Sequence, residues 1–330
     1  GVSHRLVDDD DAAGGALGEA TIAILPYNPW PTARTMKALQ AFVRGGGKLI
    51  VCYSADPALA DLLGFKLGNY IRATAPGRWS AMEFETPMAW CMPRRVLQKS
   101  SNLMPAYPAA QDAKVLAWWT DEKGKRAPEP AWVVSERGAW MSHVLLEDDP
   151  AGKLRLMGGL LGQYDPSLRP AIARRNIELL GRIDSYRSLD DAIRSIGAAP
   201  GAKTPRVREL LKTVAAQRKQ LAEFLAGNRY AEAVEMAEHL RTSLEEAYAR
   251  IQKPVAGEFR GVWDARGTGP YPGDWTRTCR ELREAGFTAL LPNVVGGGAA
   301  TYASKAIPRA DAFQRHGDQI ATCVRAAREQ

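Results

Sequence analysis

The feature that most constrains this chain is its C-terminal segment, which alternates twice between strand-like and helix-like sequence. A strand is predicted for residues 257–264 (GEFRGVWD) and a helix for residues 274–285. A second strand is predicted for residues 286–293 (GFTALLPN), followed by helical sequence that reaches Gln330. This order is typical of the opening of a (β/α)₈ barrel, which needs about 250 residues to close. We therefore predict an incomplete TIM barrel, its first two βα units, over residues 254–330.

The first region, residues 1–181, also has the sequence pattern of an α/β domain. An apolar run at 20–25 and another at 48–53 are predicted strands. A helix is predicted between them, because its apolar residues are spaced along one helical face: Met36, Leu39, Phe42 and Val43. The predicted helix stops at three consecutive glycines, residues 45–47. A strand–helix–strand unit implies a parallel sheet that is covered on both faces.

The rest of this region completes the predicted domain. Further strands are expected at 114–120, 131–134 and 139–146, and helices at 152–164 and 167–181. Residues 70–112 are rich in Pro, Met and Ser without a clear period, so they are expected to be irregular.

Residues 182–253 are predicted to contain a helical hairpin. Apolar residues recur at alternating spacings of three and four from Val207 to Phe224 and again from Tyr230 to Ile251. Gly227 and Asn228 separate the two runs, so an antiparallel pair of helices is expected. Such a pair can serve as a spacer or as a dimerisation element, and the second alternative would make the protein a homo-oligomer.

Charge and cysteine usage exclude several classes of function. The formal net charge is +7 and the isoelectric point is near 9.2. Basic and acidic residues are interspersed and no nucleic-acid-binding motif is present, so no nucleic-acid partner is expected. The four cysteines lack metal-binding spacing and are expected to be buried free thiols. No apolar run reaches the length of a membrane span, and neither a metal nor a cofactor is expected.

Two sets of motifs resemble known families. The run EFRGVW at 258–263, the Asp274-Trp275 pair and the run ALLPN at 289–293 resemble the start of the barrel in the glycosyl-hydrolase-like 10 family of bacterial proteins. The resemblance extends to about residue 312. The run ILPYNP at 24–29, with GGKL at 46–49, is similar to class I glutamine-amidotransferase-like (flavodoxin-like) domains that accompany some glycosidases. Compared with these families the chain is expected to be a fragment, truncated at both ends.

The barrel resemblance implies hydrolysis of O-glycosidic bonds in a polysaccharide by an exported bacterial protein. Such hydrolysis needs two carboxyl groups about 5 to 9.5 Å apart. The principal acids are expected on later strands of the barrel, so the catalytic residues are unassigned. The candidate substrate-binding residues are Asp264, Asn293 and Tyr302. Asp264 departs from the family, where an uncharged residue is expected. The structural alternatives are that Asp264 and Asn293 cap loops and that Tyr302 packs on the rim.

The amidotransferase-like domain is predicted to be non-catalytic. Cys52 lacks the following glycine that exposes a nucleophile, and His143 is expected in a strand without a partner. The leading hypothesis is thus a fragment of a glycoside-hydrolase-like protein. The alternative is a non-catalytic carbohydrate-binding or cell-surface scaffold protein of the same architecture.

Overall fold

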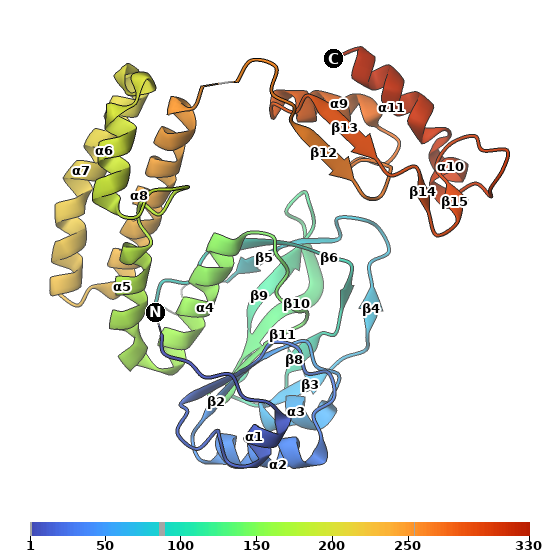
Figure 1. Ribbon diagram of the computed structural model, residues 1–330. Coiled ribbons are helices and arrows are strands. Elements are labelled where there is room, and N and C mark those ends of the chain that lie inside the picture. Colours follow the sequence, from blue (N-terminus) through green and yellow to red (C-terminus); the bar gives the residue numbers. More distant parts are fainter. Residues whose placement is uncertain (1, 86–89, 254) are drawn as a thin grey trace. The chain divides into compact units, whose positions relative to one another are not determined.

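The structure is a computed structural model that describes residues 2–85, 90–253 and 255–330 (Figure 1). The chain divides into two compact units, which we call unit 1 (Gly1–Ile251) and unit 2 (Gln252–Gln330). Unit 1 contains a sheet with flanking helices and a group of long helices, and unit 2 is a small α/β segment.

Unit 1 is built on a mixed seven-stranded sheet. In spatial order the strands are β1 (Ile22–Leu25), β2 (Lys48–Cys52), β11 (Gly138–Met141), β10 (Arg126–Val134), β9 (Lys114–Thr120), β5 (Trp79–Phe84) and β6 (Arg95–Ser100). Only β1, β2 and β11 are parallel, and the other neighbours are antiparallel. The α/β class is confirmed, but the prediction of a parallel sheet is wrong beyond these three strands. The tight turn between β9 and β10 explains this, because a short connection can join only antiparallel neighbours.

The predicted strand–helix–strand unit is present at the parallel end of the sheet. Helix α2 (Ala33–Arg44) connects β1 to β2. It begins where the Thr32 side chain accepts a hydrogen bond from the Thr35 amide at 3.1 Å. It ends before Gly46, whose φ of +96° suits a residue without a side chain.

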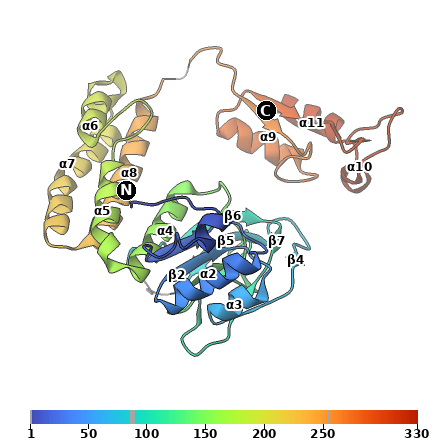
Figure 2. The same cartoon turned by 60° about the horizontal axis from the view of Figure 1, so that its bottom comes forward.

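Helices cover both faces of the sheet (Figure 2). On one face α1 (Asp9–Ala13), α2 and α3 (Pro57–Leu62) pack with Leu49, Val51 and Trp140. On the other face α4 (Pro150–Tyr164) packs with Ile50 and Cys52. Neighbouring residues of β2 therefore enter different cores, as the alternation of side chains along a strand requires.

The segment predicted to be irregular contains strands, and this prediction was wrong. Besides β5 and β6 it includes the short strands β4 (Ile71–Arg72), β7 (Asn102–Leu103) and β8 (Ala106–Pro108), and β3 (Phe65–Leu67) lies just before it. They pair as β3–β8 and β4–β7. Strands of two or three residues are too short to show an alternating pattern in sequence. Residues 86–89 of this segment lie outside the described residues.

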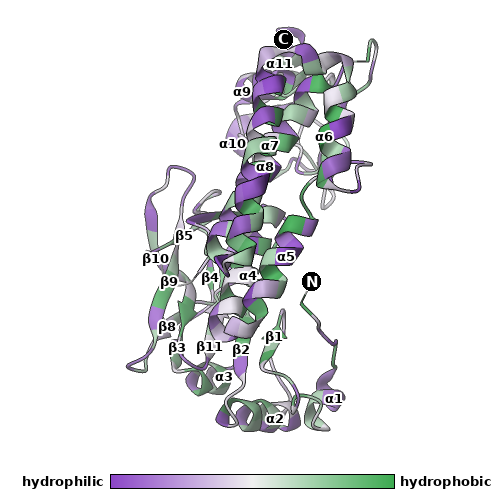
Figure 3. Cartoon of the chain, turned by 90° about the vertical axis from the view of Figure 1, so that its left-hand side faces the viewer, coloured by the Kyte–Doolittle hydropathy of each residue, from purple (hydrophilic) through white to green (hydrophobic). Residues whose placement is uncertain are grey.

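The long helices of unit 1 contain the predicted hairpin, formed by α7 (Pro205–Ala226) and α8 (Tyr230–Ile251). Hydrophobic and hydrophilic residues alternate along both helices (Figure 3). The buried seam joins one core with α5 (Arg169–Glu178) and α6 (Leu189–Ala198), the second of which was not predicted. Two short 3₁₀ turns, η1 (Pro166–Leu168) and η2 (Pro200–Lys203), precede α5 and α7. No described helix is both long and apolar enough to cross a bilayer.

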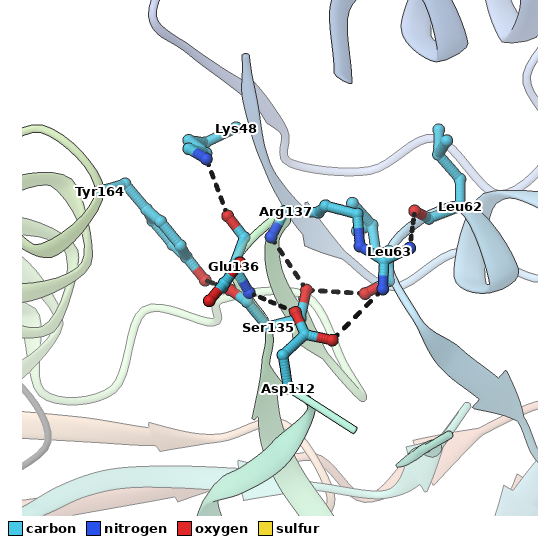
Figure 4. A network of polar contacts seen from close by, with 8 residues as sticks. All are labelled: Lys48, Leu62, Leu63, Asp112, Ser135, Glu136, Arg137 and Tyr164. Carbon is cyan, nitrogen blue, oxygen red and sulfur yellow. Dashed lines mark hydrogen bonds and ion pairs between the residues drawn. The ribbon is translucent and has the colours of Figure 1, made fainter. Parts of the chain in front are cut away.

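A polar network holds together the edge of the sheet where the parallel strands begin (Figure 4). The turn 135–137 between β10 and β11 is its centre. The Ser135 hydroxyl donates to the Leu63 carbonyl at 2.7 Å, and the Asp112 carboxylate accepts the Glu136 amide at 2.9 Å. Lys48 donates to the Glu136 carbonyl and Tyr164 to the Ser135 carbonyl. These polar groups satisfy one another, so this edge is occupied by internal contacts.

Unit 2 confirms the predicted strand–helix–strand order. The strands β12 (Gly261–Asp264) and β13 (Ala289–Pro292) are parallel, with α9 (Trp275–Glu284) between them and α10 (Asp311–His316) and α11 (Gln319–Arg328) after them. A hairpin of β14 (Val295–Gly296) and β15 (Ala299–Ala300) follows β13. The buried core consists of Trp275, Cys279, Cys323 and Ala326. All four cysteines of the protein are buried free thiols, as predicted.

Candidate functional site

The candidate site in unit 2 lies where the two parallel strands end. Asp264 pairs in register with Pro292, and the Asn293 amide donates to the Asp264 carbonyl at 2.8 Å. Two of the three predicted site residues, Asp264 and Asn293, are therefore neighbours at one sheet edge. In parallel α/β structures this carboxyl edge is where ligands bind.

The Asp264 carboxylate orders the loop that follows β12. Its Oδ1 accepts the Arg266 amide at 3.1 Å and its Oδ2 accepts the Gly269 amide at 2.7 Å. Gly267 in this loop has a φ of +67°, and a Cβ there would lie 1.8 Å from the Asn293 carbonyl oxygen. The loop can thus close on the end of β13 only with glycine at this position.

Asn293 connects this loop to the neighbouring strand end. Its Nδ2 donates to the Ala265 carbonyl at 3.2 Å, and the residue is half-buried. No residue in the described part of the chain hydrogen-bonds to its Oδ1, which therefore remains available as an acceptor.

Asn293 also lines a pocket of about 400 Å³. The polar lining residues are Arg266, Asn293, Thr301, Arg309 and Asp311, and the remaining walls are small: Ala265, Gly296, Ala299, Ala310 and Ala312. Arg309 is placed by the bridge between its backbone and Ala300, and its guanidinium lies 4.6 Å from the centre of the Phe313 ring. The pocket combines two cations, one carboxylate, one amide and one hydroxyl, groups that bind a hydroxyl-rich ligand through hydrogen bonds.

Only one of the three predicted residues lines this pocket. Asn293 lines the pocket, whereas Asp264 and Tyr302 are not among its lining residues. Tyr302 is half-buried after β15, and its carbonyl accepts the Ser304 amide at 2.7 Å. Sequence reasoning missed Arg266, Arg309 and Asp311. Arg266 follows the first strand end by two residues, which is a usable signal, but Arg309 reaches the pocket only through the fold of β14 and β15.

The cysteine and histidine of unit 1 do not form a catalytic pair. Cys52 is 2% exposed, and burial raises the pKa of its thiol to about 12. His143 lies in a bend after β11, because that strand ends at Met141, so its prediction as a strand residue was wrong. Its Nδ1 lies 3.0 Å from the Val144 carbonyl, and the ring contacts Tyr53 edge-on.

Comparison with known proteins gives weak likenesses. No protein family and no curated protein matches the chain. Among solved structures, a putative ThuA-like protein from Bacteroides uniformis is 13% identical with a TM-score of 0.39, over 55% of this chain and 78% of that one. A glutamine amidotransferase from Thermotoga maritima is 13% identical with a TM-score of 0.27, over 72% and 80% of the two chains. An alpha-L-fucosidase isoenzyme 2 from Paenibacillus thiaminolyticus is 16% identical with a TM-score of 0.27, and the match covers 49% of this chain and 25% of that one. At this level of similarity none of them defines a function for this chain.

Proposed function

We propose that this chain belongs to an exported bacterial glycoside-hydrolase-like protein that acts on a polysaccharide, and that the pocket of unit 2 binds one of its sugar residues. The observation that carries the proposal is the position of Asn293 in a polar pocket at the carboxyl edge of two parallel strands. A volume of about 400 Å³ is within the range of small-ligand sites. Sugar hydroxyls both donate and accept, which suits an amide, guanidinium groups and a carboxylate together.

The β12–β13 pair has one face covered by helices and one exposed apolar face, which supports a barrel as the structure that contains this pocket. Leu290 packs on the helical core, whereas Trp263 and its register partner Leu291 are 74% and 49% exposed. In a (β/α)₈ barrel the strands are covered by helices on one face and by other strand side chains on the other. The apolar, uncovered face of the pair is consistent with that arrangement.

Binding rather than bond cleavage is the role we assign to the described pocket residues. Glycosidic hydrolysis uses two carboxyl groups, one on each side of the bond. Asp311 is the one acid among the residues that line the pocket, and both oxygens of Asp264 already accept backbone amides. The catalytic acids therefore stay unassigned. A non-catalytic carbohydrate-binding scaffold is the second candidate, and the same observations favour it.

The test measures oligosaccharide binding to pocket variants. Cellohexaose, chitohexaose and maltohexaose serve as probes in saturation-transfer NMR titrations of the 330-residue chain. Asn293→Ala removes one hydrogen-bonding group and is expected to weaken the binding of the best probe about five- to tenfold. Arg266→Ala should weaken it similarly. Arg315→Ala, which removes an exposed arginine of the same unit outside the pocket, is the matched control.

Two outcomes would overturn or refine the proposal. Unchanged affinity in both Asn293→Ala and Arg266→Ala would return these residues to a purely structural role. Release of reducing sugar from the probes would show that the chain itself hydrolyses glycans, against the assignment of a binding role.

A further inference from the structure

A group of aromatic side chains lies at the carboxyl edge of the three parallel strands in unit 1. Tyr27 follows β1, Tyr53 follows β2 and His143 follows β11. Trp30 belongs to the same loop as Tyr27. We call these four residues the aromatic cluster. The opposite edge of the same strands is filled by the internal polar network of Figure 4.

Tyr27, Tyr53 and His143 contact one another, and Tyr27 and Trp30 are exposed, whereas His143 is only 8% exposed. Tyr27 and Tyr53 lie parallel, with ring centres 5.9 Å apart and an angle of 22° between the planes. His143 meets Tyr53 edge-on, with ring centres also 5.9 Å apart. Tyr27 is 63% and Trp30 68% exposed, so both present apolar ring surface to solvent.

The backbone holds these rings in place. Tyr53 has a φ of +53°, which is uncommon for a bulky residue and is maintained only where surrounding contacts enforce it. Its amide donates to the Met141 carbonyl at 3.0 Å. The loop that carries Tyr27 and Trp30 is attached at Pro29, whose carbonyl accepts the Ala55 amide at 3.0 Å and the Ser54 hydroxyl at 3.2 Å.

His143 adds a polar group beside the stacked rings. Its Nδ1 donates to the Val144 carbonyl, because a carbonyl oxygen can only accept, and Nε2 is then the acceptor of the neutral ring. Burial lowers the pKa of the imidazole, which favours this neutral form. No described residue hydrogen-bonds to Nε2.

We propose that the aromatic cluster is a second saccharide-binding site, in which a sugar ring packs its apolar face on Tyr27 and Trp30 while a hydroxyl donates to Nε2 of His143. Aromatic platforms combined with a hydrogen-bond acceptor suit a ligand that is apolar on its ring face and polar at its rim. The position agrees with the rule that open α/β sheets bind ligands outside the carboxyl ends of their strands. The choice of a saccharide rests on the proposed function of unit 2.

The test uses the same three hexasaccharides and a nucleoside, adenosine, as probes. In the Asn293→Ala variant, which weakens the site of unit 2, remaining saccharide binding is expected to depend on Tyr27. Adding Tyr27→Ala should lower that binding about five- to tenfold, whereas Tyr27→Phe, which keeps the ring, should leave it within about twofold. Tyr230→Ala removes a tyrosine ring from the helical hairpin and should have no effect.

The outcomes separate this inference from the proposed function. If Tyr27→Ala weakens saccharide binding and Asn293→Ala does not, the aromatic cluster is supported as a binding site and the pocket of unit 2 is rejected as one. An effect of Asn293→Ala alone, with Tyr27→Ala unchanged, overturns the second site. Tyr27-dependent binding of adenosine but of none of the hexasaccharides overturns the assignment to sugars.

Discussion

At the scale of single residues, burial and neighbouring groups determine whether a side chain can react or bind a ligand. Cys52 ends β2, a position that in sequence is compatible with a nucleophile, yet its thiol is enclosed by α4 and the sheet. The positions of Cys52 and Asn293 at strand ends could be predicted, because apolar runs mark where strands stop. The pairing of Tyr53 with Tyr27 and His143 could not, since these residues come from three distant segments that only the folded sheet brings together.

The state of the Cys52 thiol leads to a prediction about activity. With a pKa of about 12, the thiol is protonated at pH 7 and becomes a thiolate only in strongly alkaline solution. We expect no ammonia release from glutamine at neutral pH, and Cys52→Ala should change only stability, by about 1–2 kcal/mol. A coupled ammonia assay and urea unfolding measure the two effects. Glutaminase activity that disappears in Cys52→Ala would contradict this expectation.

At the scale of elements, long periodic segments were predicted well and short ones poorly. The hairpin α7–α8 has a sustained apolar repeat, so its helices and turn follow from the sequence. Helix α6 was missed although Ser188 caps its start and Leu189, Ala192, Ile193 and Ile196 repeat at helical spacing. The strands β3, β4, β7 and β8 depend on partners far along the chain, which a local pattern does not contain.

The hairpin seam gives a prediction about stability. Leu240 on α8 is fully buried in the core shared with α5, α6 and α7. Leu240→Asp places an unpaired charge in that core and is expected to cost about 3–5 kcal/mol. Urea unfolding followed by far-ultraviolet circular dichroism measures the loss.

A neighbouring substitution serves as the control. His239→Asp introduces the same side chain at an exposed position of α8 and should change stability by less than about 0.5 kcal/mol. Equal urea midpoints for wild type and Leu240→Asp would show that the seam is not part of the folded core. The proposed homo-oligomer is a separate question, because the same seam already packs on α5 and α6 within one chain.

The whole molecule consists of two units with very different cores. Unit 1 buries apolar residues on both faces of a seven-stranded sheet and among its helices. Unit 2 has a core of four buried residues, and each of its two parallel strands has a single partner among the described strands. The sequence predicted this pair of strands, but the barrel itself remains a proposal, because two paired strands do not define a barrel.

This contrast predicts different local stabilities. Amide protons of β12 and β13 should exchange at least about tenfold faster than those of β2 and β11, since fewer buried contacts oppose local opening. Hydrogen–deuterium exchange with peptide-level mass spectrometry measures both sets in one experiment. Equal protection in the two units would contradict the expectation and would indicate that unit 2 is supported by contacts beyond its own small core.

The tryptophans, whose fluorescence reports on folding, are distributed unequally between the two units. Of the nine tryptophans, only Trp263 and Trp275 belong to unit 2, and Trp263 is already open to water. In unit 1, Trp79, Trp119, Trp132 and Trp140 are enclosed in the cores of the sheet. Their emission is therefore expected at short wavelengths. A change in intrinsic fluorescence therefore reports mainly the opening of the sheet. Unit 2 can lose its fold while the protein keeps most of its native spectrum.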